Sequence, residues 1–295
     1  MLTYAFDDMQ KLLAQPRFDL CVRQLARGFA AIREAEPRIG SQFAIQQRWL
    51  MSHAALALYF RTLKSAEPGV TRLEFVKTVL ERNLASRNTA EAYFAEAYKY
   101  GLLKPIAGGH NARHARVEPT PTAVLTLGSW YKLHLDALDL LDGGNRTDHF
   151  AADGTGVLTA IEPAVAEALL TGTPAGAAEA GPAPFIWVKD GGVLMDRLIA
   201  GTDPAAEPDD ERVLTDVTSI SSLSKSVDLS PTHTGRMFAA AEAAGSLGWS
   251  GRRGRSAIWL SRGFRAEYAR SQAFKLAIID RAFSDYVAGA SAPAA

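Results

Sequence analysis

The sequence contains one cysteine, Cys21, so the chain can form neither an internal disulfide nor a metal site built from several thiolates. Cys21 lies in an amphipathic helical pattern, and we expect a buried core thiol there. Long apolar runs are also missing, which argues against a membrane-spanning helix, and residues 1–10 lack the basic and apolar regions of a secretion signal. These absences predict a globular, cytoplasmic protein.

The chain has no net charge, because 32 Lys and Arg balance 32 Asp and Glu. The charges are nevertheless segregated: the segment 136–216 holds 16 acids and four bases, so it carries −12 and the rest of the chain +12. Such an asymmetry predicts a basic working surface and an acidic part kept away from it. A cluster of solvated acids in loops is the alternative.

Apolar residues recur at three- and four-residue spacing through residues 1–64, which predicts an N-terminal helical region. Thr71 and Glu74 then have the spacing of a capping box, which predicts a short helix from Thr71 to Arg82. Ser86 is expected to cap a second helix that ends at Gly101. Its inward stripe is Ala90, Tyr93, Phe94 and Ala97. Two extended runs, 102–106 and 115–119, predict a β-hairpin, and a long helix over 121–141 closes this unit (65–141).

The same pattern returns 144 residues later, where Ser86, Phe94, Ala97 and Gly101 correspond to Ser230, Phe238, Ala241 and Gly245. A hairpin over 247–260 and a long helix over 264–287 follow, which predicts a second unit at 209–288 and a disordered tail at 289–295. The intervening segment 142–208 is rich in Gly, Pro, Ala and acids. We expect an acidic insert or connector there, with one β-hairpin over 185–195.

The order of helix, turn, helix and hairpin in both copies resembles that of the MarR-type winged helix-turn-helix regulators, over about residues 40–141 and 209–287. The chain departs from that family in its hairpin tips, which carry Gly108-Gly109-His110 in one copy and an Arg cluster in the other. The resemblance implies a mainly α fold with small β-wings and two winged units in one chain. It further implies a monomer that acts as a pseudodimer, made by duplication and fusion, in place of a homodimer.

Residues near the start of the second helix of a winged unit read base edges, and the wing contacts phosphates. In the second copy the outward positions carry no acid, and the candidate DNA-binding residues are Thr232, His233, Arg236, Arg252, Arg253 and Arg255. The first copy offers Arg87, Asn88, Lys99, Arg113 and Arg116, but Glu91 and Glu96 share its outer face. We therefore expect two unequal readers of double-stranded DNA. A solvated Arg-rich hairpin is the alternative interpretation of the second wing.

Four aromatic residues, Trp49, Tyr59, Trp130 and Tyr131, lie on helices that should meet. They suggest a site for an apolar or aromatic small-molecule effector, although aromatic residues at helical spacing also occur as plain core. The sequence contains no Gly-rich phosphate loop and no recognisable set of nucleophile and base, so we expect neither an enzyme nor a cofactor. His110 and His114 have a metal-like spacing, but they lie in a predicted loop, and we expect no metal. A winged-helix module that binds proteins instead of DNA is the alternative function.

Overall fold

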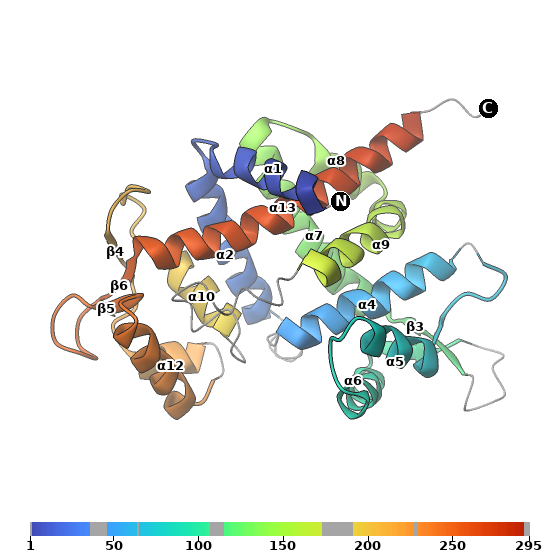
Figure 1. Cartoon of the computed structure of the whole chain (residues 1–295), viewed down its shortest axis with the longest axis horizontal. Coiled ribbons are helices and arrows are strands. Elements are labelled where there is room, and N and C mark those ends of the chain that lie inside the picture. The colour runs from blue at the N-terminus through green and yellow to red at the C-terminus, as the bar shows by residue number, and fades with distance from the viewer. Residues whose placement is uncertain are drawn as a thin grey trace. The chain divides into compact units, whose positions relative to one another are not determined.

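A computed structural model describes residues 2–35, 46–63, 65–106, 115–172, 191–226 and 229–291 (Figure 1). The described chain is mainly helical and contains two small antiparallel sheets of three strands each, as the sequence predicts at this level. Contacts divide the chain into two compact units. Unit 1 comprises Met1–Ala5, Gln47–Thr173 and Lys275–Ala295, and unit 2 comprises Phe6–Gln46 and Pro174–Phe274. None of the described helices is long and apolar enough to cross a membrane.

Unit 1 contains the first repeat, residues 70–119, which runs β1 (Val70–Thr71), α5 (Arg72–Glu81), α6 (Arg87–Lys99), β2 (Leu103–Pro105) and β3 (Arg116–Pro119). The strands pair antiparallel in the order β1-β3-β2. Both predicted caps are confirmed, because the Thr71 and Ser86 side chains accept hydrogen bonds from the amides of Glu74 and Thr89. The predicted stripe of α6 is also buried as expected: Ala90, Tyr93, Phe94 and Ala97.

Unit 2 contains the second repeat, residues 212–261, with the same order of elements: β4 (Arg212–Leu214), α11 (Ile220–Ser226), α12 (Pro231–Ala243), β5 (Leu247–Trp249) and β6 (Ile258–Ser261). Its sheet order, β4-β6-β5, matches that of the first repeat. The turns after α6 and α12 also match at an interval of 144 residues. Gly101 and Gly245 both have a left-handed φ near +70°, and each is followed by an amide that bonds back to Ala97 or Ala241.

Unit 1 also contains further helices: α4 (Gln46–Thr62), α7 (Pro121–Asp142), α8 (Arg146–Ala152), α9 (Gly154–Gly172) and the end of α13 (Arg262–Ser291). Met51 of α4 joins the core formed by Phe75, Tyr93 and Phe94 of the first repeat. Arg146 links α7, α8 and α13 through contacts to Asp139, Asp142 and Asp280. The contacts divide the N-terminal helices between the two units, since α2 (Phe18–Ala35) belongs to unit 2 and nearly all of α4 to unit 1.

Within unit 2, α2 packs along α10 (Gly191–Ala200), and the start of α13 completes the core with buried Phe264 and Tyr268. Cys21 is fully buried on α2, as predicted, and burial raises the pKa of its thiol to about 12. Arg27 of α2 donates from Nε to the carbonyl oxygen of Ala200, 3.3 Å away, at the end of α10. The N-terminal helix α1 (Leu2–Leu13) precedes α2.

The segment 142–208 differs from the expected connector, because α8, α9 and α10 account for most of its described residues. The predicted hairpin is wrong in its second strand: Val193–Met195 lie within α10, while residues 185–190 lie outside the described residues. Helices form because the apolar residues of α9 follow helical spacing, with Val157, Ile161, Val165 and Leu169 on one buried face. The prediction of a disordered tail is wrong for residues 289–291, since α13 continues to Ser291, and residues 292–295 lie outside the described residues.

Candidate nucleic-acid interface

The outward face of α12 carries the residues that the sequence predicts as readers. Thr232 and Arg236 are exposed and His233 is half-buried, whereas Thr234, Met237, Phe238 and Ala241 face the core. The Arg236 side chain makes no hydrogen bond or ion pair with any residue that the structure describes. Ser230 precedes the helix in an extended conformation, but its side chain makes no capping hydrogen bond, unlike that of the corresponding Ser86.

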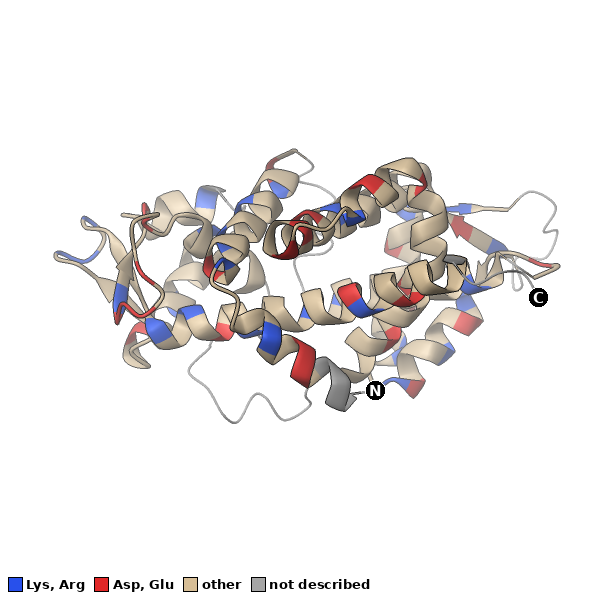
Figure 2. Ribbon diagram, turned by 90° about the horizontal axis from the view of Figure 1, so that it is seen from above, with Lys and Arg blue, Asp and Glu red and all other residues tan. Residues whose placement is uncertain are grey.

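The loop between β5 and β6 presents Arg252, Arg253 and Arg255, all of them exposed. Figure 2 shows the positions of Lys and Arg along the ribbon in blue and those of Asp and Glu in red. Its backbone is ordered locally: the Ser256 hydroxyl donates to the Arg252 carbonyl oxygen at 3.0 Å and accepts from the Gly251 amide at 2.9 Å. Arg253 lies 3.2 Å from Glu242 at the end of α12, so one of the three charges is already paired. The loop therefore holds two uncompensated arginines on a defined turn.

An acidic loop, residues 203–211, lies against the beginning of α13 in the same unit. Arg262 forms an ion pair of 2.6 Å with Asp209, and Arg265 donates to the carbonyl oxygens of Glu207, Pro208 and Asp210. The expectation that the acidic part is kept away from the basic one is therefore wrong for this loop. Arg262 and Arg265 of α13 hold this loop.

The outward face of α6 differs in charge from that of α12. Arg87, Asn88 and Lys99 are exposed as predicted, but Arg87 lies 4.0 Å from Glu91 on the same helix. Glu96 is paired at 2.5 Å with Arg48 from α4. The two acids that the sequence places on this face thus have partners, and one positive charge, that of Lys99, is left over among the charged residues named here.

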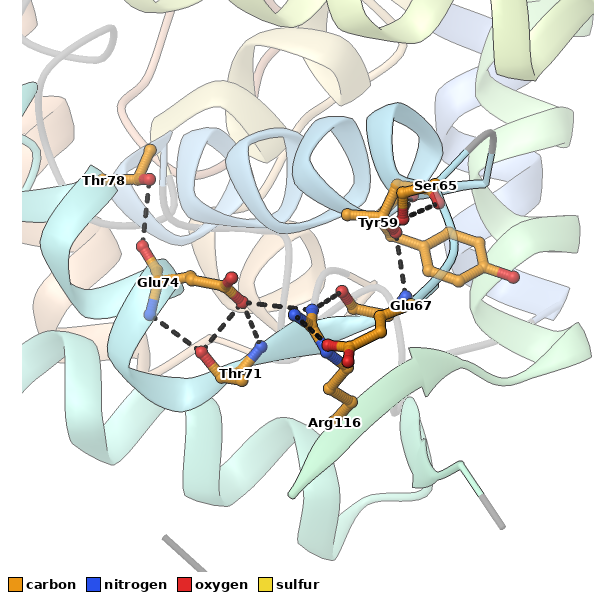
Figure 3. A network of polar contacts seen from close by, with 9 residues as sticks. Tyr59, Ser65, Glu67, Thr71, Glu74, Thr78 and Arg116 are labelled. Carbon is orange, nitrogen blue, oxygen red and sulfur yellow. Dashed lines mark hydrogen bonds and ion pairs between the residues drawn. The ribbon is translucent and has the colours of Figure 1, made fainter. Parts of the chain in front are cut away.

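Arg116 is built into the first repeat and does not face outward with the other candidates (Figure 3). It donates to the Gly69 carbonyl oxygen at 2.8 Å and lies 3.3 Å from Glu67 and 3.6 Å from Glu74. Burial raises the pKa of Glu74, but hydrogen bonds from Thr71 and the charge of Arg116 outweigh it and hold this pKa below its ordinary value. We therefore assign Arg116 a structural role. Arg113, together with His110 and His114, lies outside the described residues.

Three of the four aromatic residues come together. Trp49 and Trp130 have ring centroids 5.8 Å apart, and Trp130 packs edge-on against Tyr131 at 5.0 Å. Tyr59 lies elsewhere, next to Phe60 and packed on the core of the first repeat. The predicted set of four is therefore wrong in Tyr59.

A buried polar cluster lies beneath these rings, and the sequence did not reveal it. The Nδ1 atom of His53 is 2.9 Å from one carboxylate oxygen of Glu162, and the Tyr131 hydroxyl donates to the other at 2.6 Å. All three side chains are almost fully buried. Burial and the neighbouring Glu162 raise the pKa of Tyr131, so this hydroxyl stays protonated. The cluster links α4, α7 and α9. The sequence feature that could have indicated it is the single carboxylate of Glu162 within an apolar run.

No family model matches the chain, and no curated protein or solved structure matches it either.

Proposed function

We propose that the chain binds double-stranded DNA through two non-identical winged helix-turn-helix segments, the first and second repeats, and acts as a transcriptional regulator. In such segments the second helix enters the major groove and the hairpin contacts the backbone. The recurrence of β–α–α–β–β with the same sheet order supports this proposal. One chain would then supply both binding segments, so a monomer suffices.

The observation that carries the proposal is a set of exposed arginines that the fold does not use. Within the second repeat, Arg212 stacks over the Trp259 ring at 4.3 Å and Arg253 pairs with Glu242. Arg236, Arg252 and Arg255 make no side-chain contact of this kind with the described residues. They lie on the helix and the hairpin loop that contact DNA in winged-helix proteins.

The residue types fit distinct roles in that contact. Arg236 can donate two parallel hydrogen bonds to O6 and N7 of a guanine, and Thr232 or His233 can bond a base edge or a phosphate. The loop arginines carry no base specificity, and they fit phosphates along the groove. Binding should therefore combine a strong dependence on salt with a sequence preference set by α12.

The test is to replace Arg252, Arg253 and Arg255 together with Ala and to measure binding to a labelled random-sequence duplex by fluorescence anisotropy at several salt concentrations. We expect weaker binding to every sequence and a salt slope smaller by about 2 to 3, since each phosphate that an arginine neutralises adds about 0.9 to the slope. A matched control replaces three exposed bases on helices outside the repeats: Lys11, Lys132 and Arg281. The proposal fails for this loop if both triple variants behave alike.

The alternative function, binding of a protein partner, would use the first repeat, where two aromatic side chains at the end of α6 are exposed. Tyr98 and Tyr100 are 49% and 57% exposed, and Glu242 and Ala244 occupy the equivalent positions in the second repeat. The effector prediction is a separate proposal, and it rests on Trp49 and Trp130 alone, since Tyr131 is engaged with Glu162. A ligand that quenches tryptophan fluorescence must also change DNA affinity to count as an effector.

A further inference from the structure

Equivalent positions on α6 and α12 have opposite character. At an interval of 144 residues, Glu91 corresponds to Gly235 and Glu96 corresponds to Ala240. The outward face of α6 thus holds two acids, each beside a basic partner. The outward face of α12 has no acid before Glu242, and its only charged side chain ahead of that residue is Arg236. Since both helices have the same length and the same turn after them, the comparison is residue for residue.

Gly235 is not explained by the fold. It lies in the interior of α12, and a Cβ atom added there would meet no atom of the described residues within 4 Å beyond its neighbours and the backbone of its own helix. A glycine in a helix interior is less favourable than alanine, so this position weakens α12 without any packing in return. Gly235 is half-buried at the edge of the outer face, next to the exposed Arg236, and its missing side chain lets an outside surface approach the helix backbone closely.

We propose that α12 alone reads base sequence, with Arg236 on a guanine and Gly235 giving the helix close access to the major groove, and that the recognised site is asymmetric. This inference rests on the proposed DNA binding and specifies its substrate. The first repeat makes no base contacts, because insertion of α6 into the major groove would bring Glu91 and Glu96 between the phosphates, which repel them. At most its exposed Arg87 and Lys99 contact the DNA backbone. The preferred DNA is then one specific half-site next to a stretch of any sequence.

The experiment selects preferred duplexes from a random library and then measures affinity for the best duplex and for a scrambled one. We expect an asymmetric motif with a guanine at its centre. Arg236→Lys keeps the charge but not the two-pronged geometry, so it should lose about 5- to 150-fold in discrimination while the salt slope stays unchanged. Gly235→Glu, which copies α6, should weaken specific binding by at least about tenfold. The matched controls in α6, Glu91→Gln and Asn88→Ala, should change discrimination less than about twofold.

The outcomes separate this inference from the proposed function. Binding of no duplex by the wild type overturns both. A symmetric motif of two inverted half-sites, binding without any preference, or an equal loss in Asn88→Ala and Arg236→Lys overturns the single-reader inference and leaves DNA binding standing. Thermal unfolding of Gly235→Glu controls for folding, and if that variant is unfolded the Arg236→Lys result decides alone.

Discussion

Replacing His134 with Asn should remove a pH dependence of stability that the fold creates. His134 is fully buried on α7, and its Nδ1 atom lies 2.7 Å from the carbonyl oxygen of Trp130. Burial, and next the positive charge of Lys275, lower the pKa of His134 from 6.5 to about 3. As the pH falls below about 6.5 the unfolded chain takes up a proton at this site, and the folded chain does not until about pH 3. Stability is therefore lost as the pH falls through that window.

The size of the effect follows from the two pKa values. Between pH 6.5 and pH 3 the free energy of unfolding falls by about 5 kcal/mol in total. The fall between pH 7 and pH 5 is about 2 kcal/mol. Asn keeps a donor close to the position of Nδ1 but does not titrate. Urea unfolding of wild type and His134→Asn at pH 7, 6 and 5 measures the difference directly. The wild type should lose about 2 kcal/mol more than the variant, and parallel losses in the two proteins would refute the reasoning.

Two further sets of variants test local parts of the fold. Ser86→Ala should cost about 1 kcal/mol, because it removes a formed N-cap, whereas Ser230→Ala should cost much less, since Ser230 makes no capping hydrogen bond; equal costs by urea unfolding would contradict this difference. Glu162→Ala should destabilise by about 3 kcal/mol or more, because His53 and Tyr131 lose their buried partner, and Glu162→Gln should cost less; an exposed control, Glu81→Ala, should be near neutral in the same thermal melts.

Much of the two repeats was predictable because their signals are local. The Thr71–Glu74 capping box, the stripe of α6 and the left-handed Gly101 are each written within a few consecutive residues. The position of α12 followed from the interval of 144 residues. Local patterns determine where a helix begins, which face it buries and where it ends, so these predictions are confirmed.

Pairings between distant residues were not predictable in the same way. Arg116 is held by Gly69 and Glu67, and these residues lie before β1, far back in the sequence. Arg262 and Arg265 bind the acidic loop 203–211, more than 50 residues earlier in the sequence, and no local pattern indicates this contact. The charge of a side chain is local information, but its partner is set by the folded arrangement.

Composition predicts a connector over the segment 142–208, because the segment is rich in Gly, Pro and Ala. The helical spacing of its apolar side chains decides the structure instead. Pro163 lies inside α9 although proline usually ends a helix, and the carbonyl oxygen of Pro163 accepts from Arg61 of α4 at 3.1 Å. Packing of α9 through Val157, Ile161 and Val165 outweighed the local preference.

Nuclear magnetic resonance of the isotopically labelled full chain, titrated with a duplex, tests the central claim most directly because it locates the contact. The account predicts that the largest amide shifts fall on two segments of the second repeat, 231–243 and 250–257, with smaller shifts on 87–99. It also predicts that these shifts fade as the salt concentration rises. Shifts concentrated outside both repeats, or no shifts at low salt, would contradict DNA binding through these segments.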